Sequence, residues 1–128
     1  MNRDPRTQAI IGAAIEVHRS LGPGLLETAY RKCLAYELRK RRHMVIEEQP
    51  IPVVYDEVHM ECGFRADLIV DNQIIVELKA KTAIHPIDKA QLLSHLRLAK
   101  KRVGLLINFH EVKLIDGVSR IVNDYEQA

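Results

Sequence analysis

Two acidic residues and a lysine lie on consecutive predicted strands, in a pattern that could bind a metal ion. Asp67 belongs to the run from Glu61 to Val70, and Glu77 and Lys79 belong to the run from Ile74 to Lys81. Both runs are rich in apolar and β-branched residues, which favours strands. A hairpin of these two strands would bring two carboxylates and an ammonium group together.

A short polar loop predicts how the two strands pair. Asp71-Asn72-Gln73 separates them and is typical of a loop that closes a β-hairpin. If Val70 pairs with Ile74, counting back places Asp67 directly opposite Glu77. Side chains alternate along a strand, so both acids should share one face. We expect that face to carry Arg65, Asp67, Ile69, Ile75, Glu77 and Lys79, and the apolar face to carry Ala66, Leu68, Val70, Ile74, Val76 and Leu78.

Carboxylates this close repel each other unless a positive charge lies nearby. Mg²⁺ binds carboxylate oxygens and keeps several waters, and the backbone carbonyl of Leu78 could add a ligand. Lys79 should point to the same side as Glu77, where it could assist an attacking water or stabilise charge on a phosphate. This arrangement suits phosphodiester hydrolysis. The alternative is a solvated charge network in which Arg65 and Lys79 neutralise Asp67 and Glu77.

Three helices are predicted around the hairpin. Apolar spacing and helix-forming residues indicate helices at about Thr7 to Ser20, at Leu25 to Arg41, and from Pro86 towards Lys100. The apolar side expected for the third helix consists of Ile87, Ala90, Leu93, Leu96 and Leu98.

Further strands complete a predicted α/β fold with a mixed sheet. Val45 to Val54 contains Pro50 and Pro52, which favours an edge strand. Val103 to Phe109 is a continuous apolar run, typical of a strand buried on both faces. Val112 to Val122 is predicted to form a short strand pair that turns at Asp116-Gly117.

Composition sets the broad class of the protein. A chain of 128 residues with 47% hydrophobic content predicts one domain over residues 1–128, and its formal charge of +2 identifies no partner. The amino-terminal sequence resembles neither a signal peptide nor a membrane span, which predicts a cytoplasmic protein. Cys33 and Cys62 are expected to be reduced thiols. His59, Glu61 and Cys62 lack the spacing of a zinc site.

Two motifs resemble known families. Asp67 and, after nine intervening residues, Glu77-Leu78-Lys79 resemble the PD-(D/E)xK nuclease pattern, although Arg65-Ala66 replaces the proline before the first acid. Gly24 to Tyr30 has the form GxxExxY, with Leu21-Gly22-Pro23 before it and Gly104 to Phe109 much later. The chain is similar to the small bacterial GxxExxY protein family from about Ile10 to Asn123.

This resemblance implies a restriction-endonuclease-like fold with an αβββαβ core. It also implies that Asp67 and Glu77 bind the metal, that Lys79 is the catalytic lysine, and that Glu27 is a helix-borne acid near the metal. Without it, exposure is the simplest interpretation of Glu27. Packing is the favoured role of Tyr30.

The same superfamily often carries a glutamine followed four residues later by an aromatic residue. Here Gln91 is followed by His95, and residues four apart share a helix face. Gln91 could bind a metal-bound water or the phosphate. A core or surface histidine is the simpler interpretation of His95.

The first hypothesis is a nuclease that uses Mg²⁺ or Mn²⁺ to hydrolyse nucleic acid. Duplex DNA is the favoured partner because only 5% of residues are aromatic, which argues against a stacking platform for single strands. Arg39 to Arg42 and Lys100 to Arg102 suit helix ends and could contact phosphates if they border the site. The alternatives are a nuclease-fold module that binds nucleic acid or protein without catalysis, and an interaction module that pairs through its sheet edge. A homodimer is left open.

Overall fold

The computed structural model describes residues 4–124 and contains a five-stranded mixed sheet between helices. The elements are α1 (Pro5–Leu21), α2 (Glu27–Lys40), β1 (Val45–Tyr55), β2 (Val58–Val70), β3 (Ile74–Lys79), α3 (Pro86–Ala99), β4 (Val103–Asn108), the 3₁₀ helix η1 (Leu114–Gly117) and β5 (Val118–Val122). The strand order is β1-β2-β3-β4-β5, with β3 and β4 parallel and the other neighbours antiparallel. The predicted α/β class with a mixed sheet is confirmed.

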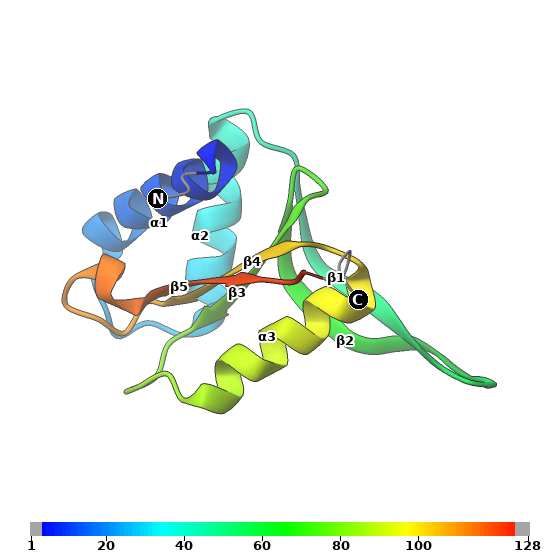
Figure 1. Ribbon diagram of the computed structural model, residues 1–128. Helices are drawn as coiled ribbons and strands as arrows, with labels where there is room; N and C mark the ends of the chain where they lie inside the picture. Colours follow the sequence, from blue (N-terminus) through cyan, green and yellow to red (C-terminus); the bar gives the residue numbers. More distant parts are fainter. Residues whose placement is uncertain (1–3, 125–128) are drawn as a thin grey trace.

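Helices cover both faces of the sheet (Figure 1). Helices α1 and α2 pack on one face around a core that includes Ile10, Leu34, Leu68, Val76 and Leu105. Helix α3 covers the other face, where Ile51, Ile75, Leu92, Leu96 and Leu106 are buried together. Burying apolar side chains on both faces stabilises the sheet by roughly 1.5–3 kcal/mol for each large side chain. The central strands therefore form a firm base for the polar residues at their ends.

The β2–β3 hairpin has the predicted register over its first three pairs. Val70 pairs with Ile74 and Leu68 pairs with Val76, as the loop predicted. The described backbone ladder ends there, so Asp67 and Glu77 extend the same register without forming a backbone pair. The two strands begin to separate at the candidate acids.

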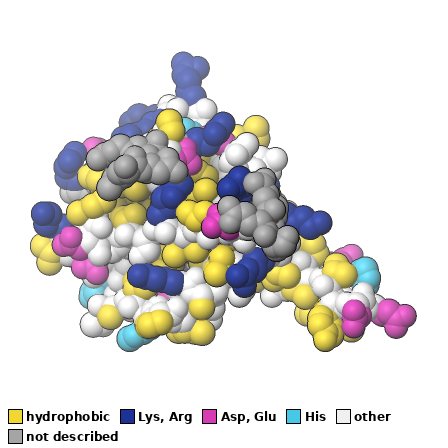
Figure 2. All heavy atoms as spheres, in the orientation of Figure 1, with side chains coloured by type: hydrophobic (Ala, Val, Ile, Leu, Met, Phe, Trp, Pro, Cys, Tyr) yellow, Lys and Arg dark blue, Asp and Glu magenta, His cyan; other side chains and the backbone are white. Residues whose placement is uncertain are grey.

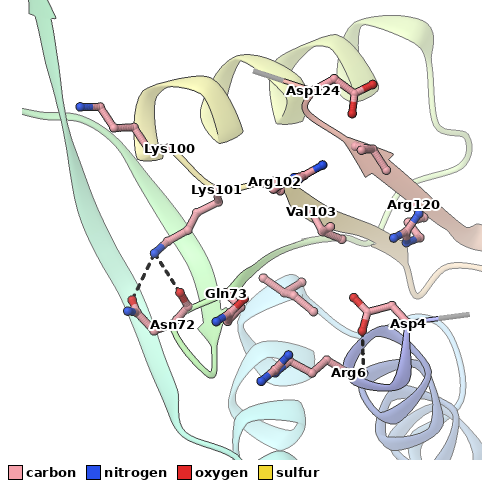
Figure 3. A pocket seen from close by; sticks show the side chains of 12 residues that line it. Asp4, Arg6, Asn72, Gln73, Lys100, Lys101, Arg102, Val103, Arg120 and Asp124 are labelled. Carbon is pink, nitrogen blue, oxygen red and sulfur yellow. Dashed lines mark hydrogen bonds between the residues drawn. The ribbon is translucent and has the colours of Figure 1, made fainter. Parts of the chain in front are cut away.

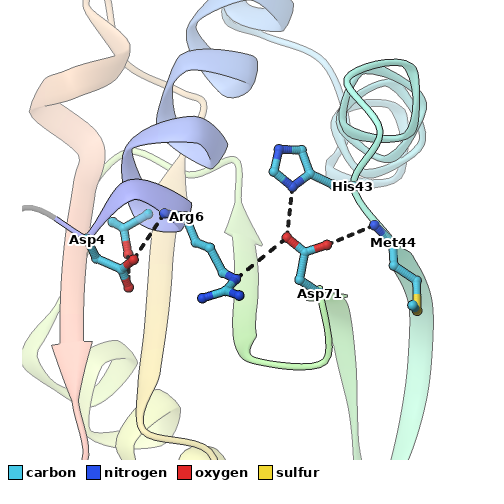
Figure 4. A network of polar contacts seen from close by, with 6 residues as sticks. Asp4, Arg6, His43, Met44 and Asp71 are labelled. Carbon is cyan, nitrogen blue, oxygen red and sulfur yellow. Dashed lines mark hydrogen bonds and ion pairs between the residues drawn. The ribbon is translucent and has the colours of Figure 1, made fainter.

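The hairpin loop is tied to the rest of the fold by Asp71 (Figure 4). Asp71 and Asn72 both have left-handed backbones, with φ of 53° and 56°. The Asp71 carboxylate accepts a hydrogen bond from Met44 N at 2.9 Å and lies 2.8 Å from His43 Nδ1. Arg6 Nε is 3.9 Å away. Three segments of the chain therefore meet at this carboxylate.

The predicted alternation of faces is wrong at Ala66. Ala66 packs with the apolar residues under α3, whereas Leu68 packs under α1 and α2, although the prediction placed them on one face. The neighbouring strand β1 is irregular at the same level. Glu48 has a left-handed backbone, with φ of 51°, between the pairs Glu47–Leu68 and Gln49–Ala66. It lies opposite Asp67, the position at which the side-chain alternation of β2 changes.

The buried side of α3 also differs from the prediction. Ile87, Ala90 and Leu98, expected on the apolar side, are exposed, and Ile87 is 61% exposed. The buried residues are Asp88, Leu92 and Leu96. A charged residue is tolerated there because Asp88 accepts hydrogen bonds from Lys81 Nζ and His85 N, each at 2.8 Å. Apolar spacing alone could not predict an inward-facing aspartate.

The predicted strand pair over 112–122 is wrong as well. Residues 114–117 form η1, and β5 is a single strand that pairs with β4. Leu114 is buried in the core beneath α1. At Gly117, a Cβ would lie 2.5 Å from the Asn108 backbone oxygen, so the chain passes too close to β4 for a larger residue. Core packing therefore replaces the expected turn.

Strands β1 and β2 extend beyond the body of the protein as an arm, which we define as residues 53–62 (Figure 1). The edge position predicted for β1 is confirmed. Val54, Tyr55, Val58 and Met60 are exposed on the arm. Its sequence contains three acidic residues and no Lys or Arg, and no basic side chain appears at its tip in Figure 2.

Candidate active site

Asp67 is held where β2 and β3 separate. Its Oδ2 accepts a hydrogen bond from Leu78 N at 2.8 Å. This side-chain bond takes the place of the next ladder bond and fixes the carboxylate between the strands. The predicted proximity of Asp67 to the Glu77-Leu78-Lys79 segment is therefore confirmed.

The environment of Asp67 is short of positive charge. Partial burial raises the pKa of Asp67, the Leu78 N–H lowers it, and the charges of Glu77 and Glu27 raise it again. Lys79 lowers the value slightly, and the resulting pKa is about 6. The carboxylate is therefore destabilised in its charged form, as expected for a partly buried acid with two acidic neighbours.

Glu77 has a histidine partner from α3. His95 Nδ1 lies 3.2 Å from Glu77 Oε2, and the His95 ring stacks on Phe64 with centroids 3.7 Å apart. The sequence analysis favours an ordinary core or surface role for His95, so it does not predict this contact. The spacing of four residues between Gln91 and His95 is the feature of the sequence that could have indicated it. Gln91 itself is exposed one turn earlier, and no contact within residues 4–124 brings it to the acids.

Tyr30 packs against the core and braces the corner that precedes α2. It is fully buried and stacks on Phe109 with centroids 4.3 Å apart. Its hydroxyl donates to Gly22 O at 2.6 Å and accepts from Leu25 N at 3.1 Å. Gly24 within this corner has φ of 105°, which favours glycine. The packing role predicted for Tyr30 is confirmed, and these contacts explain how the Gly24-to-Tyr30 spacing shapes the corner.

Glu27 reaches the acid cluster from the first turn of α2. It is exposed, as its simplest interpretation predicted, yet it lines a hollow of about 200 Å³ together with Asp67 and Leu78. A carboxylate is favourable at this helix end because the dipole is positive there. The structure therefore places Glu27 near Asp67, and its nearness to a metal ion stays a prediction.

Arg31 borders the same hollow and was missed by the sequence analysis. It lies one turn after Glu27, and that spacing was the signal that could have found it. Its guanidinium is 3.2 Å from Glu48 and 3.8 Å from Glu47. Its Nε is buried without a hydrogen bond among the described residues. The site therefore includes a cation that is held in place by two glutamates of β1.

Lys79 is positioned by the paired ends of two parallel strands. Lys79 O accepts a hydrogen bond from Phe109 N at 2.9 Å. The adjacent Asn108 is fully buried and exchanges hydrogen bonds with both backbone groups of Lys81, at 2.8 and 3.1 Å. Lys81 in turn bonds Asp88, and that bond is the main reason why the pKa of Asp88 is lowered. The segment after Lys79 is therefore fixed on both sides.

The donor set matches a hard divalent cation only in part. Asp67 and Glu77 supply carboxylate oxygens, but within residues 4–124 no group of three or more His, Cys, Asp or Glu side chains is arranged to hold a metal ion. A cation that retains several waters needs few protein ligands, and Mg²⁺ is of this kind. The residues therefore fit a partly hydrated ion better than a fully enclosed one.

The two predicted basic clusters have different positions relative to these acids. Lys100 to Arg102 line a separate hollow with Ile74 and Arg120, at the opposite end of β3 from Lys79. Arg39 bonds Glu47 and the Val45 backbone oxygen, and thereby ties α2 to β1. The cluster from Lys100 to Arg102 therefore does not border the acid site, so it cannot make the phosphate contacts that were considered for it there.

The family comparison agrees with this geometry. The model of the PD-(D/E)XK nuclease superfamily matches residues 4–121. The chain belongs to this superfamily, and its mixed sheet flanked by helices is a restriction-endonuclease-like fold. Comparisons with curated proteins and with solved structures give no match. In the part of the chain that the structure describes, no helix has the length and apolar character to cross a membrane.

Proposed function

We propose that this protein is a nuclease that uses Mg²⁺ or Mn²⁺ to hydrolyse phosphodiester bonds in nucleic acid. The observation that carries the proposal is the gathering of Asp67, Glu77 and Glu27 around the point where β2 and β3 separate, with Lys79 two residues beyond Glu77. Membership of the nuclease superfamily supports the same class of reaction.

Asp67 and Glu77 are the proposed metal ligands, with the Leu78 carbonyl as a third. Each carboxylate has one oxygen occupied, Asp67 Oδ2 by Leu78 N and Glu77 Oε2 by His95, which leaves a second oxygen for the ion. When bound, the cation would supply Lewis acidity, which polarises a phosphoryl oxygen and activates water.

The chain's own cations would handle the phosphate. Lys79 is proposed to stabilise the negative charge that develops on the phosphoryl oxygens, because a fixed ammonium group is effective where water is partly excluded. Arg31 lines the same hollow and would add positive charge beside the phosphate, while its guanidinium pairs with Glu47 and Glu48. Glu27 adds negative charge that favours cation binding. Gln91 is exposed on α3, and from that position it would contact the phosphate of a bound substrate.

A second candidate is a nuclease-fold module that binds without catalysis. The contact between Glu77 and His95 favours it, because a carboxylate that already has a hydrogen-bond partner needs a metal ion less. In this case nucleic-acid binding would depend on salt but not on a divalent cation.

The finer parts of the proposal concern family and substrate. The Tyr30 hydroxyl bonds and the left-handed Gly24 support membership of the GxxExxY family, since they give the glycine and the tyrosine of that motif a shared structural role in the corner before α2. Duplex DNA is the proposed substrate because the chain contains few aromatic residues for stacking.

If the protein forms a homodimer, the proposed contact is through β1, because this strand lies at the edge of the sheet.

The test combines metal binding with cleavage. The wild type and Glu77→Ala are titrated with Mg²⁺ or Mn²⁺ by calorimetry, and both are then assayed for nicking of a plasmid. Glu57→Ala, on the exposed turn of the arm, is the matched control that removes a carboxylate elsewhere. We expect binding and nicking to be lost together in Glu77→Ala and kept in the control. Absence of metal binding in the wild type would favour the non-catalytic module.

A further inference from the structure

A second hollow lies at the other end of the parallel strands from the acids. It has a volume of about 580 Å³ and is bordered by the start of α1, the residues after α3, and β5 (Figure 3). We call it the basic cavity because five of its residues are basic and two are acidic. The basic residues are Arg6, Lys100, Lys101, Arg102 and Arg120.

Favourable interactions with helix dipoles explain the positions of only some of these basic residues. Lys100 to Arg102 directly follow α3, where cations are favourable. Arg6 is in the first turn of α1, which contains no acidic residue and where the dipole disfavours a cation. Arg120 comes from β5, and its side chain has no hydrogen-bond or ion-pair partner within residues 4–124. Cations from three elements thus converge in a concave space, where the lining residues carry five positive and two negative charges and Arg6 also pairs with Asp71 at 3.9 Å.

One of these cations is already held in position. Lys101 Nζ donates to Asn72 O at 2.9 Å and to Asn72 Oδ1 at 3.2 Å (Figure 3). An ammonium group has three hydrogens, so one remains for a further acceptor. The nearby Asp4 does not neutralise the cavity fully, because its carboxylate caps α1 by accepting from Arg6 N and the Thr7 hydroxyl.

We propose that the basic cavity binds phosphate groups. Phosphate suits several convergent cations because it offers multiple charged oxygens, and arginine binds it in a bidentate manner. Ile74, Val103 and Val122 add apolar surface on which a sugar or base could rest. The volume lies in the range of small-molecule sites. Ile74 and Lys79 are separated by roughly 16 Å of strand, so this cavity is distinct from the acid cluster.

The same chemistry is offered by two sources, namely a free nucleotide and the backbone of a nucleic acid. The first probe is pyrophosphate, titrated by calorimetry. The second is a fluorescent 20-base-pair duplex, followed by anisotropy. Both are used with EDTA, so that a divalent ion at Asp67 and Glu77 cannot contribute. The proteins compared are the wild type, Arg6→Gln, Arg120→Gln, and the control Arg97→Gln, which removes an exposed arginine from the last turn of α3.

We expect Arg6→Gln and Arg120→Gln to weaken binding of at least one probe by roughly tenfold, and Arg97→Gln to leave it unchanged. For the duplex, each lost phosphate contact should lower the salt slope by about one. Weakening for pyrophosphate alone identifies a free phosphate ligand, and weakening for the duplex identifies the nucleic-acid backbone. Equal behaviour of all three variants and the wild type would overturn the proposal.

This test is independent of nuclease activity. Glu77→Ala should bind pyrophosphate as the wild type does, even though it loses metal-dependent cleavage. Failure of the nuclease proposal would therefore leave the result at the basic cavity unchanged. Circular dichroism of each single variant checks the fold, and since both arginines are exposed, their replacement should not disturb the core.

Discussion

Asp67 and Asp71 lie four residues apart, one within β2 and one in the loop that follows it, yet their surroundings are opposite. Asp71 is partly buried, which raises its pKa, but bonds from His43 and Met44 N, with Arg6 nearby, outweigh this and hold the pKa below its ordinary value. Asp67 has one N–H donor and two acidic neighbours, so its pKa rises to about 6. One carboxylate is stabilised by its environment and the other is destabilised.

The difference separates a structural acid from a candidate functional one. The contacts of Asp71 join α1, the segment before β1 and the hairpin loop, which is a stabilising role. At neutral pH the charged Asp67 carboxylate reduces the stability of the fold. Acids with strongly shifted pKa values that line a hollow are typical of functional sites. The two residues therefore provide matched substitutions of the same chemical type.

The largest expected difference is in cleavage. Asp67→Asn should reduce metal-dependent plasmid nicking by roughly a hundredfold or more, because a neutral amide cannot replace a carboxylate ligand. Asp71→Asn should retain nicking within about threefold, since Asp71 does not contact the acid cluster. Equal loss in both variants would indicate a general effect on the fold and break the comparison.

The second difference is in stability at neutral pH. Asp67→Asn should raise the free energy of unfolding by about 1–2 kcal/mol at pH 7, after allowance for partial solvent exposure. A raised pKa makes the contribution of Asp67 favourable below pH 3.8 and unfavourable as the pH rises through about 6. The gain should therefore disappear near pH 4. Urea unfolding at several pH values measures it, and a variant less stable than the wild type at pH 7 would contradict it.

Asp71→Asn should have the opposite sign and a smaller size. Losing the charge beside His43 should lower the free energy of unfolding by about 1 kcal/mol at pH 7. Because its pKa is lowered, Asp71 stabilises the fold above its ordinary value of 3.8 and loses this effect as the pH falls below it. The variant and the wild type should then converge in acid. The same urea series tests this, and an unchanged midpoint at pH 7 would remove Asp71 from its structural role.

The smallest effect concerns the neighbour of Asp67. Glu27→Gln should lower the pKa of Asp67, since the Glu27 charge raises it, but only slightly because burial is the larger cause. An NMR titration of the Asp67 carboxyl carbon measures the change. Glu37→Gln, ten residues further along α2, provides the control. A pKa that does not move would show that Glu27 acts too far away to belong to the cluster.

Local sequence predicted the acid site because its geometry depends on one hairpin. The three-residue loop fixes the register, and the register brings Asp67 to the segment from Glu77 to Lys79. The start of α3 could also be predicted from local sequence, because proline is favoured at the first helical position and Pro86 is the first residue of this helix. These features depend on residues close together in the chain.

The features that were missed depend on contacts between distant segments. Ala66 packs on the other face at the point where Glu48, on a neighbouring strand, has a left-handed backbone. His95 reaches Glu77 across 18 positions, and Asp88 turns inward because Lys81 and His85 bond it. Apolar periodicity contains no information about such pairs.

Asp4 and Asp124 both border the basic cavity, on opposite sides of it (Figure 3). A bulky label attached to the side chain at position 4 or 124 would therefore lie at the rim and compete with a ligand for the entrance, and an acidic label would act as a tethered inhibitor at high local concentration. A label at the tip of the arm, near Asp56, would leave the cavity open.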